Sequence, residues 1–396
     1  MTSHLHPDSF RPGQIVRKSF GLKEAIQESL KQDYASPIIQ KIVEADYLYS
    51  EKGLTFHLAR SFGFCYGVDR AVDLAYETRK KFPDRRIFLT AQIIHNPRVN
   101  KNLQEMGIDF LEDYSQVTSK DVVVLPAFGA TASQIETLKG IGCVLVDTIC
   151  GSVLNVWKRV ESYAMERFTA VIHGKYYHEE TQATSSRVFE YPGGRYLVVL
   201  DLNETDYVCR YIREGVEKQD FLDRFAKQVS PGFDPDQDLK RIGVANQTTM
   251  LMSESIEIAR RLEQALADRY GSENLATHFR NFDTICSATE DRQNAMIDLV
   301  KNRHLDLMLV IGGFNSSNTN HLAKIASSKI PRTYHIEDKD FLISPDEIRH
   351  KPVGKFDVVT SKDWLPSGEL SIGITSGAST PNQVMGDVIE RVLLFR

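Results

Sequence analysis

The chain has 396 residues, 42% of them hydrophobic and 26% charged, which is ordinary for a globular protein with two or three α/β domains. The net charge of −5 gives no basic surface for nucleic acid or an anionic membrane, so an anionic substrate must be bound by a local site. No run approaches the roughly 18–20 apolar residues of a membrane span, and the first residues resemble neither a signal nor a transit peptide, so we expect a cytoplasmic protein.

Residues 1–52 are polar and helix-prone and lack the strand–loop–helix pattern that follows, so we expect an N-terminal extension packed on the surface of the main body. From residue 53 onward, short β-branched runs alternate with amphipathic helical segments. This alternation predicts an α/β architecture with buried parallel strands. The strands are expected within residues 86–92, 121–129, 144–150, 169–174, 241–247, 305–313 and 371–378.

Three of the five cysteines share one position relative to the predicted elements. The tetrapeptide Asp-Thr-Ile-Cys occurs at residues 147–150 and again at 283–286, each time between a strand and a helix. The segment RSFGFC places Cys65 in the same way before the helical residues 67–82. This internal repeat indicates three similar units, each offering one thiolate.

The other two cysteines, Cys143 and Cys209, lack this setting, and we interpret them as the small core or surface residues that most cytosolic cysteines are. An odd number of widely spaced cysteines argues against a disulfide framework. The sequence has no Cys-x-x-Cys pair, which excludes a zinc ribbon or a thioredoxin-like motif.

If three α/β units pack around a pseudo-threefold axis, their strand ends meet at its centre and bring Cys65, Cys150 and Cys286 together. The helix N-terminus beside each cysteine is expected to lower the thiol pKa. Three thiolates suit either an iron–sulfur cluster, whose fourth iron stays free for a substrate oxygen, or zinc with a bound water. The expected division is an N-terminal extension 1–52 and three α/β units, 53–150, 151–285 and 286–396.

Polar side chains follow several of the other predicted strands, at the edge where parallel sheets bind ligands. His95 lies in IIHNPRV, His178 and Glu180 lie in HGKYYHEET, and Thr248 lies in ANQTTM. Taken alone, each histidine is more often a hydrogen-bonded structural residue, and Glu180 more often a solvated acid. Together, at strand ends, they favour a site in which histidines neutralise a diphosphate through charge-assisted hydrogen bonds.

Two further loops have the composition of phosphate sites. The segment GGFNSSNTN brings two amides and two hydroxyls to the start of a predicted helix, and TSGASTP places Ser379 before the last helix. Free backbone N–H groups and the helix dipole favour an anion at such positions. Plain helix capping is the alternative for either loop alone. The residues of the first loop are Asn315, Ser316, Ser317 and Asn318.

These motifs together resemble one family, the 4-hydroxy-3-methylbut-2-enyl diphosphate reductases of the non-mevalonate isoprenoid pathway. SFGFCYGVDRA, IIHNPR, DTICGSV, YYHEETQAT, NQTT, DTICSATEDRQ, NSSNTN and ITSGASTP occur in the order and at roughly the spacing of that family, from about residue 55 to the C-terminus. The long N-terminal extension, the PAFGA loop and the extra stretch around 205–240 are similar to its plastid and cyanobacterial branch.

The resemblance implies a trefoil of three α/β units around a central [4Fe-4S] cluster bound by Cys65, Cys150 and Cys286. It implies that Glu180, with Thr248 near the substrate hydroxyl, supplies the proton for a reductive dehydroxylation. Two electrons from a donor such as ferredoxin or flavodoxin then yield isopentenyl and dimethylallyl diphosphate. The residues it implies for binding the diphosphate substrate are His95, His178, Thr248, Ser316, Ser317, Asn318 and Ser379.

One position departs from the family pattern, because Phe128 replaces a second diphosphate-binding histidine of the commoner bacterial form. On the residues alone, two other classes of protein stay open. A non-catalytic iron–sulfur sensor or electron carrier would need the thiolates but not the NSSN loop, Glu180 or Thr248. A zinc-stabilised binding protein would need no reductant.

Overall fold

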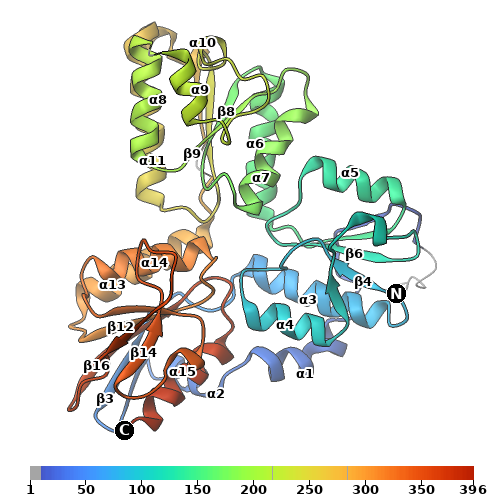
Figure 1. Cartoon of the computed structure of the whole chain (residues 1–396). Helices are drawn as coiled ribbons and strands as arrows, with labels where there is room; N and C mark the ends of the chain where they lie inside the picture. The colour runs from blue at the N-terminus through green and yellow to red at the C-terminus, as the bar shows by residue number, and fades with distance from the viewer. Residues whose placement is uncertain (1–9, 216, 283) are drawn as a thin grey trace.

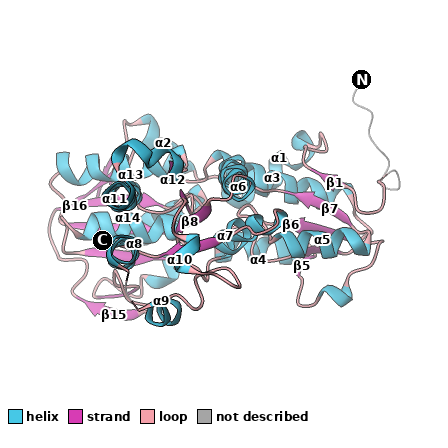
Figure 2. Cartoon of the chain, turned by 90° about the horizontal axis from the view of Figure 1, so that it is seen from above, coloured by secondary structure: helices cyan, strands magenta, loops and turns pink. Residues whose placement is uncertain are grey.

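The computed structural model describes residues 10–215, 217–282 and 284–396, which form three lobes, each built around its own sheet (Figure 1). Nearly all strand pairs in these sheets are parallel, which confirms the predicted α/β architecture. Seen from above, helices lie beside the strands in all three lobes (Figure 2). Asp283, the first residue of the second Asp-Thr-Ile-Cys copy, and residues 1–9 of the predicted extension lie outside the described residues.

The first sheet is parallel throughout, and its strands β6 and β7 are buried along their whole length, as expected for strands covered on both faces. Its order is β1 (Ile15–Val16), β7 (Val144–Asp147), β6 (Val122–Leu125), β4 (Ile87–Leu89) and β5 (Ile108–Phe110). The helices of this lobe are α3 (Tyr66–Lys81), α4 (Pro97–Glu105) and α5 (Ala132–Ile141), with the 3-10 helix η2 (Tyr114–Gln116).

The second sheet, also parallel, runs in the order β11 (Phe279–Asn281), β10 (Ile242–Asn246), β8 (Thr169–His173) and β9 (Tyr196–Val199). The stretch around 205–240 belongs to its outer layer, where Phe221 and Phe225 are buried against the sheet and its helices. The helices are α6 (Gly151–Met165), α7 (Glu179–Ser185), η3 (Ser186–Glu190), α8 (Leu202–Glu214), α9 (Lys218–Arg224), α10 (Pro235–Asp238), α11 (Met252–Tyr270), η4 (Ser272–Asn274) and α12 (Leu275–His278).

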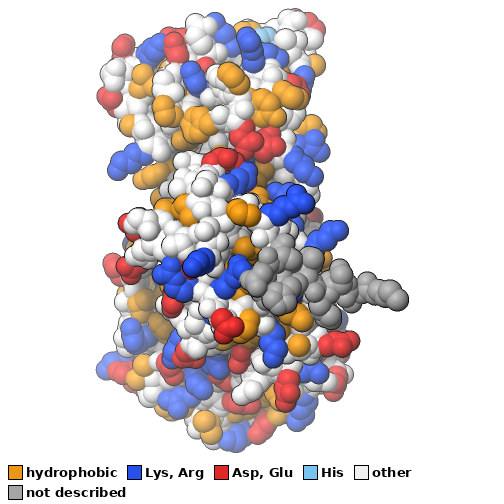
Figure 3. All heavy atoms as spheres, turned by 90° about the vertical axis from the view of Figure 1, so that its right-hand side faces the viewer, with side chains coloured by type: hydrophobic (Ala, Val, Ile, Leu, Met, Phe, Trp, Pro, Cys, Tyr) orange, Lys and Arg blue, Asp and Glu red, His pale blue; other side chains and the backbone are white. Residues whose placement is uncertain are grey.

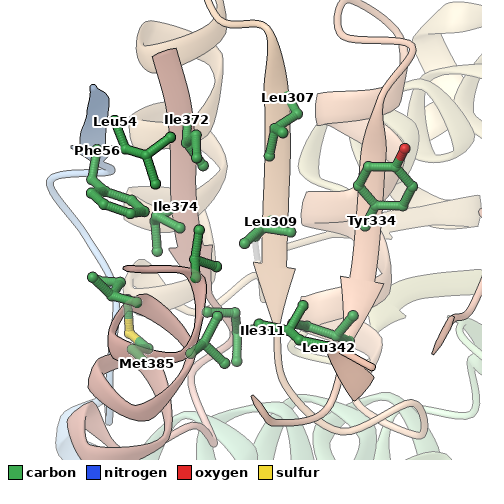
Figure 4. Packing of buried hydrophobic residues seen from close by; sticks show 14 of the residues in the cluster. Leu54, Phe56, Leu307, Leu309, Ile311, Tyr334, Leu342, Ile372, Ile374 and Met385 are labelled. Atoms are coloured by element: carbon green, nitrogen blue, oxygen red, sulfur yellow. The ribbon is translucent and has the colours of Figure 1, made fainter. Parts of the chain in front are cut away.

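The third sheet holds the largest hydrophobic core, in which strand side chains meet the final helix (Figure 4). Its order is β13 (Thr333–Ile336), β12 (Leu307–Ile311), β16 (Leu370–Ser376), β3 (Leu54–Leu58) and β2 (Leu48–Glu51), of which only β2 runs antiparallel to its neighbour among the described strands. The other elements are α13 (Ser287–Asn302), α14 (Ser317–Ser327), η5 (Lys339–Phe341), the hairpin β14 (Glu347–His350) and β15 (Val359–Lys362), and α15 (Asn382–Leu394).

The first residues do more than pack on the surface. The helices α1 (Lys23–Tyr34) and α2 (Pro37–Glu44) pack on α3 and α15, as expected for a surface extension, and the segment also adds an edge strand to two sheets, β1 beside β7 and β2 beside β3. Such short edge strands pair through backbone groups, so their side chains carry little pattern. In addition, β3, which we placed in the first unit, pairs with β16 of the third sheet. The borders after residues 150 and 285 stay predictions.

Local sequence signals start several helices at the carboxyl ends of strands, where the site lies. Asn96 caps α4 with a 3.1 Å bond from the Val99 amide, and Pro97 occupies the first turn. At α5, Thr131 and Gln134 form a reciprocal capping box, and Gly142 ends the helix in the left-handed region. The loops between strands and helices are thereby held in fixed positions.

The surface carries charges of both signs. On the face shown in Figure 3, Lys and Arg side chains are interspersed with Asp and Glu, in keeping with the small net charge of −5. Within the described ranges, no helix has both the length and the apolar character that crossing a bilayer requires.

Candidate functional site

Three thiols lie at helix N-termini, one in each lobe. Cys65, Cys150 and Cys286 are the residues directly before α3, α6 and α13. The amide of each donates to a carbonyl of a strand-end loop. Cys65 bonds Ala378 at 3.2 Å, Cys150 bonds Ala127 at 2.8 Å, and Cys286 bonds Thr248 at 3.3 Å. The backbone of each thiol residue is therefore fixed by the sheets.

The side chains of these cysteines share one space. A Cβ atom added to Gly67 would lie 2.5 Å from Cys150 Sγ, so the first turn of α3, beside Cys65, is open to that sulfur only because residue 67 is glycine. Cys65 interacts electrostatically with both Cys150 and Cys286. This glycine was part of the SFGFCYGVDRA motif, but its steric role could not be read from the sequence.

The residues themselves suit both metal alternatives of the sequence analysis. Three thiols suit an iron–sulfur cluster with one free iron, and they also suit a tetrahedral zinc with a bound water. The described residues also bring His95, His178 and Glu179 together as possible metal ligands.

The expected lowering of the thiol pKa is wrong for two of the cysteines. Burial raises the pKa of Cys65, and it raises the pKa of Cys286 to about 11 despite the bond of its thiol to Thr289 Oγ1 at 3.0 Å. Desolvation of the thiolate outweighs the helix N-terminus there. Cys143 and Cys209 are fully buried core residues, as interpreted from the sequence.

A buried arginine supplies the positive charge near these thiols. Arg292 donates to the carbonyl of Gly63 at 2.7 Å and interacts electrostatically with Cys65 and Cys286. Its Nε has no partner within the described structure. Sequence reasoning missed Arg292, although it lies in the quoted DTICSATEDRQ segment, because nothing local shows that the side chain turns inward.

Thr248 connects the acid Glu180 to one of the three thiol residues. The Thr248 amide donates to Glu180 Oε1 at 2.6 Å, and the Thr248 carbonyl accepts the bond from Cys286. Glu180 is buried, and desolvation raises the pKa of its carboxyl to about 7. The structure thus places a carboxyl that carries a proton near neutral pH one residue away from a cysteine of the site.

The two predicted histidines form a pair, with 3.1 Å between His95 Nε2 and His178 Nε2. The Glu180 amide donates to His178 Nδ1 at 3.1 Å, so His178 carries its proton on Nε2 and donates it to His95. His95 Nδ1 in turn donates to Gln92 Oε1 at 3.2 Å. Burial lowers the pKa of both histidines, so the pair is neutral.

The surroundings of the pair are one acid and one aromatic ring. Glu179 lies with its carboxylate 3.9 Å from each histidine, but His178 has no free lone pair for a metal in this tautomer. The Phe128 ring stacks on His95 with centroids 4.8 Å apart, and it offers no hydrogen-bond donor. The free site therefore presents uncharged imidazoles and an apolar wall.

The NSSN and GAST loops meet the thiols and the histidines. A Cβ added to Gly313 would lie 2.4 Å from the His95 carbonyl oxygen, so the NSSN loop packs against the histidine loop. Asn318 accepts from the Ala378 amide at 3.2 Å and donates to Thr289 at 3.4 Å, next to Cys286. The loops of all three lobes converge on one region.

The hydroxyls of these loops differ in how they are used. Ser316 caps α14, accepting from the Thr319 amide at 3.3 Å, as the capping alternative expected. Ser317 accepts from Gln247 Nε2 at 3.2 Å. Ser379 is half-buried and has no hydrogen-bond partner among described residues, so it is free to donate to a ligand. Gln247, in the quoted NQTT segment, was missed because its role depends on a neighbour from another lobe.

The comparisons with known proteins all indicate the same protein family. The model of a family described as LytB protein matches residues 56–393. A protein of Picosynechococcus sp. named 4-hydroxy-3-methylbut-2-enyl diphosphate reductase is 48% identical over 382 residues, covering 95% of this chain and 93% of the relative. A Synechococcus protein of the same name is 50% identical over 384 residues, covering 95% and 94%.

Two solved structures are similar in fold. The structure of (E)-4-hydroxy-3-methyl-but-2-enyl diphosphate reductase, described as the terminal enzyme of the non-mevalonate pathway, is 26% identical with a TM-score of 0.53, covering 85% of this chain and 98% of that one. The structure of the corresponding Plasmodium falciparum reductase is 22% identical with a TM-score of 0.62, covering 85% and 86%.

Proposed function

The chain belongs to the LytB protein family, and from this premise we propose that it reduces (E)-4-hydroxy-3-methylbut-2-enyl diphosphate to isopentenyl and dimethylallyl diphosphate. The observation that carries the proposal is the contact between the buried acid Glu180 and Thr248, whose carbonyl binds the amide of Cys286. An electron carrier or sensor needs the thiols but has no use for a protonated carboxyl beside them. Anaerobic turnover with a chemical reductant tests the proposal.

Cys65, Cys150 and Cys286 hold a [4Fe-4S] cluster in this proposal. Support comes from the common position of the three cysteines directly before helices and from the buried Arg292, which balances negative charge. When bound, such a cluster supplies electrons one at a time and a Lewis-acidic iron. The electrons come from a small carrier protein such as ferredoxin or flavodoxin, and the reaction takes place in the cytoplasm.

The diphosphate binds between the histidine pair and the NSSN and GAST loops. His95, His178, Ser316, Ser317, Asn318, Ser379 and Thr248 are its proposed ligands, as expected from the sequence. Helix α14 begins at Ser317, so its first amides add donors where the helix dipole favours an anion. Most of these side chains already have partners that fix their orientation, which limits the entropy lost on binding.

Glu180 is the proposed general acid. Breaking the allylic C4–O bond expels the oxygen, which leaves as water once it has accepted a proton from the Glu180 carboxyl. The carbon skeleton takes up two electrons and a second proton, and the end at which it is protonated decides which of the two products forms. Thr248 orients the reaction by binding Glu180 and lying next to Cys286. A carboxyl with a pKa of about 7 suits proton donation at neutral pH.

The pH dependence of turnover follows from this role. Because the pKa of Glu180 is raised to about 7, the acid form is present below that pH and is lost above it. The turnover number should therefore be nearly constant below about pH 6 and fall about tenfold per unit above about pH 8. Saturating steady-state kinetics, with iron content checked at each pH, measures this. A profile without this fall between pH 6 and 9 contradicts the role of Glu180.

Ser379→Ala should weaken diphosphate binding. The hydroxyl has no internal partner to lose, and a hydrogen bond to a charged group contributes about 1.5–3 kcal/mol, or roughly ten- to a hundredfold in affinity. Calorimetric titration with inorganic diphosphate measures it. Ser371→Ala, at the opposite end of β16, is the matched control and should bind as the wild type does. Equal affinity of both variants would mean that the GAST loop only starts a helix.

A further inference from the structure

Lys175 is a cation at the site that sequence reasoning did not single out. It lies on the loop between β8 and α7, three residues before His178, and its side chain is half-buried. Its charge acts on His95, His178 and His321, all of which have a pKa lowered by burial and by this lysine. The ammonium therefore lies near the histidine pair and near helix α14.

The loop of Lys175 is tied to the NSSN loop by one side chain. The Lys175 amide donates to Gln247 Oε1 at 3.3 Å, and Gln247 Nε2 donates to Ser317 Oγ at 3.2 Å. Gln247 also accepts from Thr181 Oγ1 at 3.3 Å, which holds the start of α7 in place. The loop carrying Lys175 is thus fixed between the histidines on one side and the NSSN loop on the other.

This ammonium has no partner of its own. Among the described residues it donates no hydrogen bond and lies within 4.0 Å of no carboxylate, although Glu179 is only four positions away. Lys351, whose charge acts on Lys175, by contrast donates to the Phe314 carbonyl at 3.0 Å and to Asn320 at 3.3 Å. Keeping a half-buried cation unpaired and beside a second cation costs free energy that a bound anion would recover.

A cation at this place would offset the charge of the proposed ligand. The histidines form a neutral pair that shares one N–H between them, and Phe128 contributes none. The serines and Asn318 are neutral donors. A diphosphate ester carries two to three negative charges, and taking these out of water without a cation is unfavourable. We propose that the ammonium of Lys175 binds the substrate diphosphate directly. This inference rests on the proposed function.

The test compares four proteins in their cluster-loaded form by anaerobic calorimetric titration with inorganic diphosphate. Lys175→Met should bind roughly ten- to a hundredfold more weakly, because a charge-assisted bond is lost, and the dependence of affinity on salt should become shallower. Lys175→Arg keeps the charge and should stay within about threefold of wild type. The matched control is Lys324→Met. Lys324 is an exposed lysine whose charge also lowers the pKa of His321, but it pairs with Glu254 at 3.9 Å.

The outcomes separate the two proposals. If Lys175→Met binds like the control, or if Lys175→Arg binds as weakly as Lys175→Met, the role of the charge is overturned while the proposed function stands. If the wild-type protein does not bind diphosphate, both are overturned. If Ser379→Ala binds diphosphate normally and Lys175→Met does not, the inference about Lys175 holds. In that case only the GAST loop is excluded as a diphosphate ligand. Melting curves confirm that each variant is folded. If Lys175→Met is not folded, the comparison of Lys175→Arg with the wild-type protein decides the test.

Discussion

Cys65→Ala, Cys150→Ala and Cys286→Ala should each remove the iron and sulfide bound by the protein and abolish turnover. Each substitution deletes one of three thiolates that converge from three helix N-termini, and two remaining thiolates cannot hold the cluster in place. Iron and acid-labile sulfide analysis of the anaerobically purified proteins, together with the absorbance near 400 nm, measures the loss.

Cys143→Ala and Cys209→Ala are the matched controls. Both thiols are buried in hydrophobic cores away from the site, so each variant should keep full iron content and activity, with stability lowered by about 1 kcal/mol for the lost sulfur. Full cluster occupancy in any of the first three variants would remove that cysteine from the ligand set. Zinc in place of iron in the wild-type protein would overturn the cofactor itself.

Glu180→Gln should lower the turnover number by about 10²–10⁴-fold, the usual contribution of a general acid, with little change in substrate affinity. The amide oxygen of Gln can still accept the bond from the Thr248 amide, so the local structure is kept while the transferable proton is lost. Anaerobic steady-state kinetics gives the turnover number, and titration of substrate monitored through the absorbance of the cluster gives the affinity.

Glu161→Gln is a suitable control, because the pKa of Glu161 is also raised by burial while the residue lies on α6 outside the site. It should leave both quantities unchanged. If Glu180→Gln turns over at nearly the wild-type rate, the proton comes from another group, and the role of Glu180 must be withdrawn. A large loss of affinity with normal turnover would instead make Glu180 a binding residue.

The elements of the site could be predicted because their signals are local. The repeated Asp-Thr-Ile-Cys, the NSSN loop and the capping residues each act within a few positions of the chain, and the structure places all three cysteines directly before helices. The position of β3 could not be predicted, because its partner β16 lies more than 300 residues away and a buried strand does not specify its sheet. The same holds for β1, a two-residue strand.

The chemistry of single groups was harder to predict for a related reason. The effect of a helix N-terminus on Cys286 is visible in the sequence, but the burial that raises the pKa of its thiol is not. Lys175 and Arg292 matter through the groups around them, which include His95 for Lys175 and Cys65 for Arg292, both from another lobe. Residue type and spacing indicated which loops meet in the structure, whereas the electrostatic balance inside the candidate site needed the tertiary structure.

The measurement that tests the central claim most directly is a single anaerobic turnover experiment on the full chain. The protein with its iron and sulfide intact is mixed with a chemical reductant and (E)-4-hydroxy-3-methylbut-2-enyl diphosphate, and the products are separated and quantified. The proposed function predicts isopentenyl and dimethylallyl diphosphate in a sum equal to the substrate consumed, with two electrons used per product. Unchanged substrate in the presence of an intact, reducible cluster would contradict it.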